Sequence, residues 1–229
     1  MIKPWMFKPY RNLPSTEHLV GYWPLDETSG TNAPDLSGNG NDGTLVNMED
    51  ADWVDGVVGK CLDFDGVDEK VSADGVISDV DLTTTGNATM CGWFKRTAAS
   101  GRSFQGFGTD GNWGNYFFIE FDDDLVAVLL KGAVGSKPRA TYNVGYSGSW
   151  VFICGVKTGE EIELFVNGVS AAADTTSGLG GNIVVTDFDI GHGYSSTYAF
   201  NGLIDEVRIY STALTASEIK ALYDYPAGV

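Results

Sequence analysis

The sequence predicts an all-β protein, a sandwich of two antiparallel sheets with one short helix near the C-terminus. Short runs rich in Val, Ile, Phe, Tyr and Trp recur along the chain and are separated by turn residues, a pattern typical of sandwiches. The chain also contains 30 glycines, many of them between those runs. A length of 229 residues suits one large β domain.

The predicted strands follow one another from residue 20 to residue 210. The clearest are TMCGWFKR (89–96), NYFFIEF (115–121), LVAVLL (125–130), WVFICGVK (150–157), EIELFVNG (161–168) and NIVVTDFDIG (182–191). Residues 158–161 are expected to join two strands, and Asn167-Gly168 is expected to reverse the chain into a third. An Asn-Gly pair supplies the positive φ angles of a tight hairpin turn.

The C-terminus carries the one convincing helix pattern. Thr215 and Glu218 have the spacing of a capping box, in which each side chain satisfies a backbone N–H of the other. Ile219, Leu222 and Tyr223 follow at helical spacing and form an apolar stripe. A helix that begins after Thr215 and packs on the sandwich is therefore expected.

The net charge of −17 makes nucleic acid and anionic lipid surfaces poor partners. No apolar run approaches the roughly 18 residues that cross a bilayer, so membrane insertion is not expected. Cys61, Cys91 and Cys154 lie in separate apolar runs and form no C-x-x-C motif. They are expected to be free buried thiols.

Residues 1–17 differ in composition from the domain at 18–229. They combine prolines with basic and aromatic residues, a mixture that favours an extended segment. We expect an arm that docks on a partner, and the alternative is a frayed tail. This start lacks the apolar region of a Sec signal peptide, which is consistent with a virion or extracellular protein made without one.

The segment 26–42 is dense in oxygen donors, including Asp26, Glu27 and Asp35. Calcium takes about six to eight oxygen ligands, which a loop of this composition offers. The alternative is a run of Asx turns satisfied by their own backbone.

Residues 201–210, NGLIDEVRIY, raise a question about Asp205. Strict alternation of side chains along a strand puts one carboxylate into an apolar row. The expected row is Leu203, Asp205, Val207 and Ile209. A buried carboxylate is unfavourable without a partner. Its partner is expected to be a cation, backbone N–H groups, or an arginine such as Arg208 or Arg11.

Several of these stretches together resemble laminin-G-like domains of the concanavalin A-like jelly-roll group. They are YWPLDETSGTNAPDLSGNGNDGTL, CLDFDGVDEKV, ATMCGWFKR, WVFICGVKTGEEIELFVNGV and FNGLIDEVRIYSTALTASEI, in the order typical of those domains. The resemblance spans about residues 18–224. It implies two curved antiparallel sheets, a concave face available to a ligand, and a structural calcium ion that joins the two ends of the chain.

The layout is also similar to glycoside hydrolases of family 16. That resemblance implies a metal held by Asp26 or Glu27, by the Asp65-Gly66 segment, and by Asp205. The same hydrolases carry a Glu-x-Asp-x-x-Glu strand. In the nearest stretch here, IEFDDDL, Glu120 and Asp122 share a face but Leu125 stands at the third position. Catalysis is therefore not expected.

Glycan recognition uses exposed aromatic side chains beside polar groups. The candidates in predicted loops are Trp113, Tyr116, Tyr194 and Tyr198, with Tyr142 and Tyr146 as further possibilities. Each of them is more often rim packing than a sugar platform.

Three functions follow from these observations. The first is a non-catalytic binding or structural sandwich, such as a phage virion decoration or fibre-type protein, that assembles with protein partners and with its own copies through the arm. The second is a glycan-binding module of a secreted protein. The third is a divergent glycosidase or lyase on the same fold.

Overall fold

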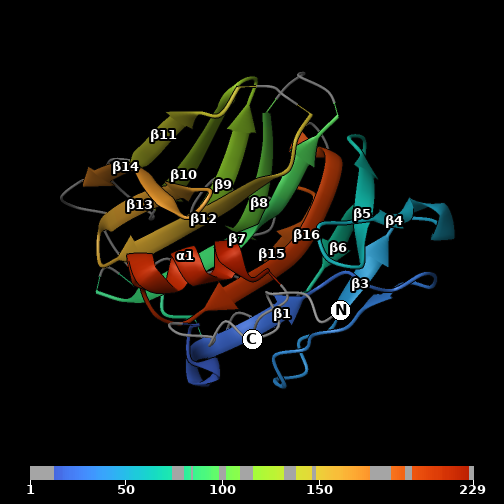
Figure 1. Cartoon of the computed structure of the whole chain (residues 1–229), viewed down its shortest axis with the longest axis horizontal. Helices are drawn as coiled ribbons and strands as arrows, with labels where there is room; N and C mark the ends of the chain where they lie inside the picture. The colour runs from blue at the N-terminus through green and yellow to red at the C-terminus, as the bar shows by residue number, and fades with distance from the viewer. Residues whose placement is uncertain are drawn as a thin grey trace, which may run out of the picture.

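The computed structural model describes residues 13–73, 80–83, 85–97, 102–108, 116–131, 138–145, 148–175, 187–193 and 198–226. In this part of the chain two antiparallel sheets pack face to face, and one α-helix lies on the outside of the first sheet (Figure 1). The predicted all-β sandwich with a single short C-terminal helix is confirmed. No helix among these residues is both long and apolar enough to cross a membrane.

The first sheet contains the strands nearest the viewer in Figure 1. They are β1 (Leu19–Trp23), β4 (Trp53–Asp55), β5 (Lys60–Asp65), β7 (Asn87–Arg96), β12 (Val151–Thr158), β13 (Glu161–Val166), β14 (Val169–Thr175) and β16 (Asn201–Tyr210). Their order is β14-β13-β12-β7-β16-β5-β4, and β1 pairs with the second half of β16. The first and last long strands are therefore neighbours, as the jelly-roll resemblance implies.

The second sheet packs behind the first. Its strands are β2 (Asn32–Ala33), β3 (Gly43–Val46), β6 (Lys70–Ser72), β8 (Arg102–Gly108), β9 (Tyr116–Asp122), β10 (Leu125–Lys131), β11 (Arg139–Asn143) and β15 (Asp187–Ile190). Their order is β11-β10-β9-β8-β15-β6-β3-β2. Short 3-10 turns, η2 (Thr16–His18) and η3 (Asp50–Asp52), precede β1 and β4.

The turn chemistry predicted from the sequence is present. Thr158 pairs with Glu161 across the β12–β13 hairpin. At the next reversal Asn167 and Gly168 have φ angles of 52° and 76°, both in the left-handed region that a two-residue hairpin requires. This turn delivers β14 to the edge of the first sheet.

Two separate apolar clusters hold the layers together. The main core lies between the sheets and includes Trp23, Phe64, Phe94, Phe117, Phe121, Phe188 and Phe200. A second cluster, here called the outer cluster, lies on the other face of the first sheet. It contains Leu19, Tyr22, Cys91, Trp93, Phe152, Cys154, Val156, Phe165, Tyr210, Leu214, Ile219 and Leu222.

The helix α1 (Ala216–Asp224) covers the outer cluster. It begins as predicted, because Glu218 N–H donates to the Thr215 hydroxyl and the Glu218 carboxylate accepts from Thr215 N–H. Its residues Ile219 and Leu222 are buried on the face that packs on the sheet, and the ring of Tyr223 stacks on Trp93 with centroids 5.4 Å apart. The helix is thus held by its cap and by its apolar face.

Candidate binding groove and buried carboxylates

The second half of the oxygen-rich loop after β1, residues 35–42, is held by hydrogen bonds to Asp35 and Asp42. Asp35 accepts hydrogen bonds from the N–H groups of Tyr22, Ser37 and Asn41 at 2.8–2.9 Å and from the Ser37 hydroxyl at 2.7 Å. The amide of Asn39 donates to the Leu19 carbonyl at 2.8 Å. The Asx-turn alternative therefore describes this loop, whose carboxylate at Asp35 is fully used by the protein.

A β-bulge in β16 corrects the predicted row of side chains around Asp205. The register with β7 shifts between Asp205 and Arg208, and Glu206 has a φ angle of 58°. The extra residue moves Asp205 out of the row of Val207 and Ile209, which face the main core. Asp205 instead lies opposite Trp93, on the face of the outer cluster. The strict alternation expected from the sequence was wrong at this point.

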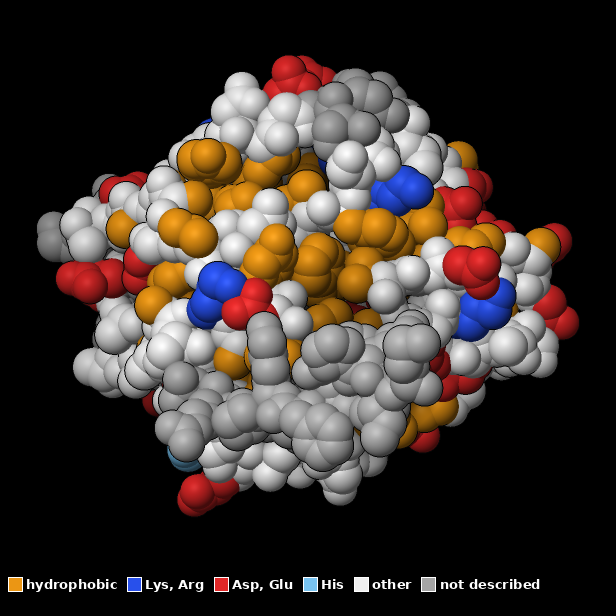
Figure 2. Space-filling view, viewed as in Figure 1, with side chains coloured by type: hydrophobic (Ala, Val, Ile, Leu, Met, Phe, Trp, Pro, Cys, Tyr) orange, Lys and Arg blue, Asp and Glu red, His pale blue; other side chains and the backbone are white. Residues whose placement is uncertain are grey.

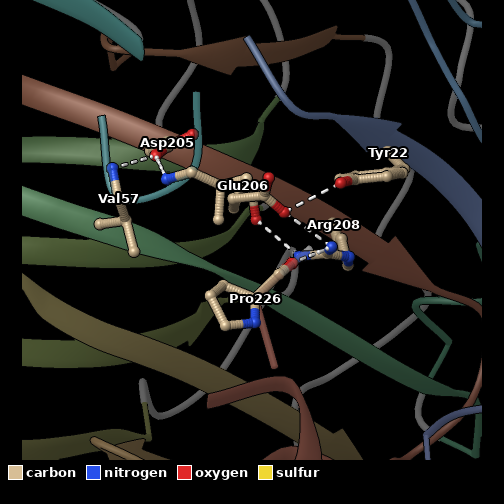
Figure 3. A network of polar contacts seen from close by, with 7 residues as sticks. Tyr22, Val57, Asp205, Glu206, Arg208 and Pro226 are labelled. Atoms are coloured by element: carbon tan, nitrogen blue, oxygen red, sulfur yellow. Dashed lines mark hydrogen bonds and ion pairs between the residues drawn. The ribbon is translucent and has the colours of Figure 1, made fainter. Parts of the chain in front are cut away.

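The partners of Asp205 are backbone N–H groups. Its Oδ2 accepts from Val57 N–H at 2.7 Å and from Val58 N–H at 3.1 Å, both in the turn between β4 and β5 (Figure 3). Asp26 binds the same turn, because its Oδ1 accepts from Lys60 N–H at 2.6 Å. Burial raises the pKa of Asp205 to about 7 against the lowering effect of those hydrogen bonds. The two chain ends therefore meet at residues 56–60 through carboxylate–amide bonds.

A buried ion pair lies beside Asp205 (Figure 3). The Arg208 guanidinium donates to Glu206 Oε2 at 2.7 Å and to the Pro226 carbonyl at 2.5 Å, and it lies 4.0 Å from the Tyr22 ring centroid. The Tyr22 hydroxyl donates to the same Glu206 oxygen at 2.9 Å. Burial raises the pKa of Glu206, and the Arg208 charge opposes that effect. This network joins β1, β16 and the chain after α1.

The proposed calcium ligands are only partly brought together. Two buried oxygens, Asp205 Oδ1 and Glu27 Oε2, make no hydrogen bond. Burial raises the pKa of both carboxyl groups, and the negative charge of Asp26 adds to this effect. Asp65 is exposed and pairs with Asn201, four residues before Asp205 on β16. That offset is about 13 Å along a strand. Among the described residues no group of three or more His, Cys, Asp or Glu side chains is arranged to hold a metal.

The aromatic residues predicted to bind a ligand differ in their position and exposure in the structure. Trp113 and Tyr194 lie outside the described residues. Tyr116 is the first residue of β9, not a loop residue, and is 7% exposed with its ring stacked on Phe118 at 4.8 Å. Tyr198 is half-buried against a small apolar cluster of Tyr116, Phe118, Ala127 and Leu129. The packing alternative therefore describes Tyr116 better than the role of an exposed sugar platform.

The carboxylates considered for catalysis are engaged in ion pairing. Glu120 is 2% exposed, and its Oε2 accepts from Arg139 Nε at 3.0 Å and from a second guanidinium nitrogen at 2.8 Å. Arg139 also lies 4.0 Å from Asp122. Both acidic side chains therefore share one arginine on the outer face of the second sheet.

A groove opens where the edges of the two sheets meet. The edge strand β11 of the second sheet faces the β13–β14 hairpin of the first, and the space between them has a volume of about 380 Å³. Its lining consists of Tyr142, Asn143, Val144, Val151, Val166, Asn167, Val169, Ser170 and Ala171. None of these lining residues is charged. In Figure 2 hydrophobic side chains gather across the middle of the viewed face, and acidic ones lie mainly at its rim.

Exposed apolar side chains and fixed amides stand side by side in this groove. Tyr142 is 44% and Val169 62% exposed, values unusual for large apolar side chains in this protein. The Oδ1 atoms of Asn143 and Asn167 accept from Gly145 N–H at 2.9 Å and from Phe152 N–H at 3.0 Å. These bonds fix both amides and leave their Nδ2 groups as donors. Sugar-binding sites commonly combine an aromatic ring with oriented hydrogen-bond donors.

The sequence indicated Tyr142 as a candidate but placed it in a loop, whereas it lies within the edge strand β11. The rest of the groove was missed. Asn167 was assigned to a turn, and Val169 to the strand that follows it. The signal available in the sequence was a valine, Val169, directly after a predicted Asn-Gly turn. Tyr146, the other possibility in that region, lies outside the described residues.

A much smaller cavity, of about 20 Å³, adjoins the groove. It shares Val144 and Val151 with the groove and is also lined by Arg96, Asp123, Gly148 and Ser149, among others.

Several solved structures share this fold. One is domain 4 of AbnA, an extracellular arabinanase from Geobacillus stearothermophilus, in complex with arabinotriose (18% identity, TM-score 0.69, covering 90% of this chain and 98% of that chain). Another is the binding domain of Paraclostridial Mosquitocidal Protein 1 (17% identity, TM-score 0.68, covering 92% of this chain and 53% of that chain). A third is the Trypanosoma rangeli sialidase (16% identity, TM-score 0.69, covering 94% of this chain and 33% of that chain).

These identities are low, so the likeness concerns the fold. The chain spans about half of the mosquitocidal binding domain and a third of the sialidase. No curated protein sequence matches the chain. A family model described as the concanavalin A-like lectin/glucanases superfamily matches residues 68–220. Because that match covers more than half of the chain, the protein belongs to the concanavalin A-like lectin/glucanases superfamily.

Proposed function

We propose that this protein is a non-catalytic binding module whose groove between β11 and the β13–β14 hairpin takes a neutral glycan. The observation that carries the proposal is a groove whose described lining residues are all uncharged, in a protein of net charge −17. Among those residues an anionic ligand would meet no cation, whereas sugar hydroxyls would meet the Asn143 and Asn167 amides. The volume of about 380 Å³ lies in the range of small-ligand sites.

The ligand class is an oligosaccharide, not a single sugar. A small second cavity adjoins the groove at Val144 and Val151, so a chain of sugars would contact more protein than one unit. The arabinotriose complex of the AbnA domain supports this choice, because that domain has the same fold and almost the same length as this chain. The identity of the sugar is left to the experiment.

The test is binding of neutral oligosaccharides, arabinotriose included, measured on a glycan array and then by calorimetry. Tyr142→Ala should weaken binding about tenfold, since aromatic stacking contributes on the order of 1 kcal/mol. Tyr142→Phe should retain it. Leu36→Ala is the control, because Leu36 is also exposed, at 60%, but lies outside the groove. If no neutral glycan binds, or if Tyr142→Ala binds as well as the wild type, the proposal fails.

A role in a larger assembly is a second proposal and is compatible with the first. The arm ends in residues that pack on the domain, because Leu13 contacts the outer cluster and Pro14 is buried. The preceding basic and aromatic residues would then extend from this face toward an acidic body or partner, where complementary charge orients contacts. A virion decoration or fibre-type protein, located on the virion or outside the cell, fits such an arm.

Deletion of residues 1–12 tests the assembly role. The deletion stops before Leu13 and Pro14, so the domain should stay folded while homo-oligomers or complexes with partners dissociate. Light scattering coupled to gel filtration measures the mass, and circular dichroism measures the fold. A truncated protein that keeps the mass of the full chain would contradict the docking arm.

We also propose a structural calcium ion near Asp26 and Asp205. The oxygens in this region that make no hydrogen bond are Asp205 Oδ1 and Glu27 Oε2, and the Asp26 carboxylate binds the same turn as Asp205. The three carboxyl groups are not arranged as a metal site in the structure, so the ion would have to draw them together. A cation there would offset the repulsion between these carboxylates and join the two chain ends. Asp65 is too far along β5 to be a ligand.

The calcium proposal is tested by thermal melting in EDTA and in millimolar CaCl₂. Binding to the folded state alone stabilises it by about 3 kcal/mol when calcium is a hundredfold above Kd. The melting temperature should rise with calcium in the wild type and not in Asp205→Asn. Equal melting temperatures of the wild type in both buffers would show that the amide groups at residues 57–60 are sufficient.

A further inference from the structure

Two of the three cysteines face each other across neighbouring strands. Cys91 on β7 is the register partner of Cys154 on β12, and both side chains are fully buried in the outer cluster beneath α1. Both are free thiols in the structure. Burial raises the pKa of the Cys154 thiol, and the neighbouring Cys91 raises it further.

The backbone geometry of this pair suits a disulfide. Directly opposed residues in antiparallel strands have Cα atoms about 4.5–5.5 Å apart. Disulfides join Cα atoms about 4.4–6.8 Å apart, so the strands need not move to form the bond. The two side chains point to the same face, because both belong to the outer cluster.

The third cysteine has no such partner. Cys61 lies on β5, and β16 separates β5 from β7. Two strand spacings amount to nearly 10 Å, beyond the reach of a disulfide. The arrangement therefore selects one pairing out of the three that three cysteines allow.

We propose that Cys91 and Cys154 form a disulfide bond when the protein folds in an oxidising environment. In the reaction the two thiols lose two protons and two electrons, an S–S bond forms, and a small disulfide such as oxidised glutathione is reduced to two thiols. The inference is independent of the glycan proposal, since the outer cluster and the groove are different parts of the molecule.

Burial determines when the bond forms. Both side chains are fully inaccessible, and a buried thiol reacts poorly because the thiolate is the reactive species. The exchange therefore takes place before α1 packs over the strands. Once α1 is in place, the same packing keeps reductants away from the bond.

The test is oxidative refolding of the full chain. The protein is unfolded in urea with dithiothreitol and refolded either with a glutathione redox pair or with dithiothreitol. It is then unfolded again in iodoacetamide and analysed by mass spectrometry. One alkylated cysteine, Cys61, is expected after oxidative refolding and three after reductive refolding. Three alkylated cysteines in both samples, or a linked peptide that contains Cys61, would overturn the proposal.

Two variants and one kinetic measurement complete the test. Cys61→Ala should still form the bond, and the double variant Cys91→Ala/Cys154→Ala should melt below the oxidised wild type. If the double variant does not fold, the peptide map of Cys61→Ala alone decides the pairing. The folded, reduced protein should keep three thiols in oxidised glutathione without denaturant, and rapid oxidation of it would contradict the sealing role of α1.

Discussion

Arg208 neutralises Glu206, a fully buried acidic group. It and Glu206 are both 0% exposed, and its guanidinium also binds the Pro226 carbonyl and the face of Tyr22. Replacing a whole buried ion pair by apolar residues is often harmless, but removing one member leaves an uncompensated charge. The stability of the fold therefore depends on keeping Glu206 and Arg208 paired.

Arg208→Met should destabilise the fold by about 3–5 kcal/mol, because it leaves Glu206 buried without its cation. Adding Glu206→Gln should recover part of that loss. Urea denaturation of the single and double variants measures both effects. Lys220→Met is the control, since its ion pair with Asp224 is partly exposed and surface pairs contribute about 1 kcal/mol or less. An Arg208→Met variant as stable as the control would contradict this account.

At the scale of elements, the sequence was sufficient where the pattern is local. The Asn167-Gly168 reversal and the capping box of α1 follow from residues a few positions apart, and both are confirmed. The bulge in β16 is different, because the left-handed conformation of Glu206 is fixed by its contacts with Tyr22 and Arg208. No local preference of glutamate predicts it.

The groove could not be predicted for a related reason. Its two walls come from β11 and β14, which belong to different sheets. Each residue type was visible in the sequence, but the meeting of the two edges depends on sheet order and packing. Likewise, Tyr116 falls within the predicted strand at 115–121 but was also grouped with the loop aromatics before it. The structure begins β9 at this residue, and element boundaries are the least certain part of a sequence prediction.

The cap of α1 can be tested as a local element. Thr215→Ala removes the hydroxyl that accepts from Glu218 N–H and should cost about 1 kcal/mol. For a chain of this size the melting temperature should fall by about 2–4 °C. Thr215→Ser keeps the hydroxyl and should melt like the wild type. Equal losses in both variants, measured by calorimetry, would show that the threonine methyl group matters instead of the cap.

The whole molecule combines a net charge of −17 with several carboxyl groups that resist ionisation. Burial raises the pKa of Glu27, Asp63, Glu69, Asp205 and Glu206, and the pKa values of Glu69 and Asp205 rise to about 7. In the unfolded chain these groups have pKa values near 4. The folded state therefore binds more protons than the unfolded state between about pH 4 and pH 7. By linkage, stability falls as the pH rises through this window.

Other groups act outside that window or against it. Hydrogen bonds lower the pKa of Asp55 and of Asp81, so their stabilisation is lost only below about pH 4. Burial lowers the pKa of Lys157 to about 8, so this lysine titrates above the window. Burial also lowers the pKa of His192, which opposes the trend of the five carboxyl groups. The carboxyl groups outnumber it, so stability is expected to be highest near pH 4 and to fall toward pH 7.

The urea midpoint should therefore be higher at pH 5 than at pH 7.5. Repulsion among surface charges would give the same trend, so the comparison is repeated in 0.5 M NaCl. Salt screens exposed charges but leaves the burial of a carboxyl group unchanged, and the difference should persist. Asp205→Asn and Glu69→Gln remove the two groups with the largest shifts and should each flatten the profile, whereas the exposed Asp55→Asn should not. A midpoint that is equal or higher at pH 7.5 would mean that the buried carboxylates are ionised at little cost, for which a bound cation at Asp205 would be the direct explanation.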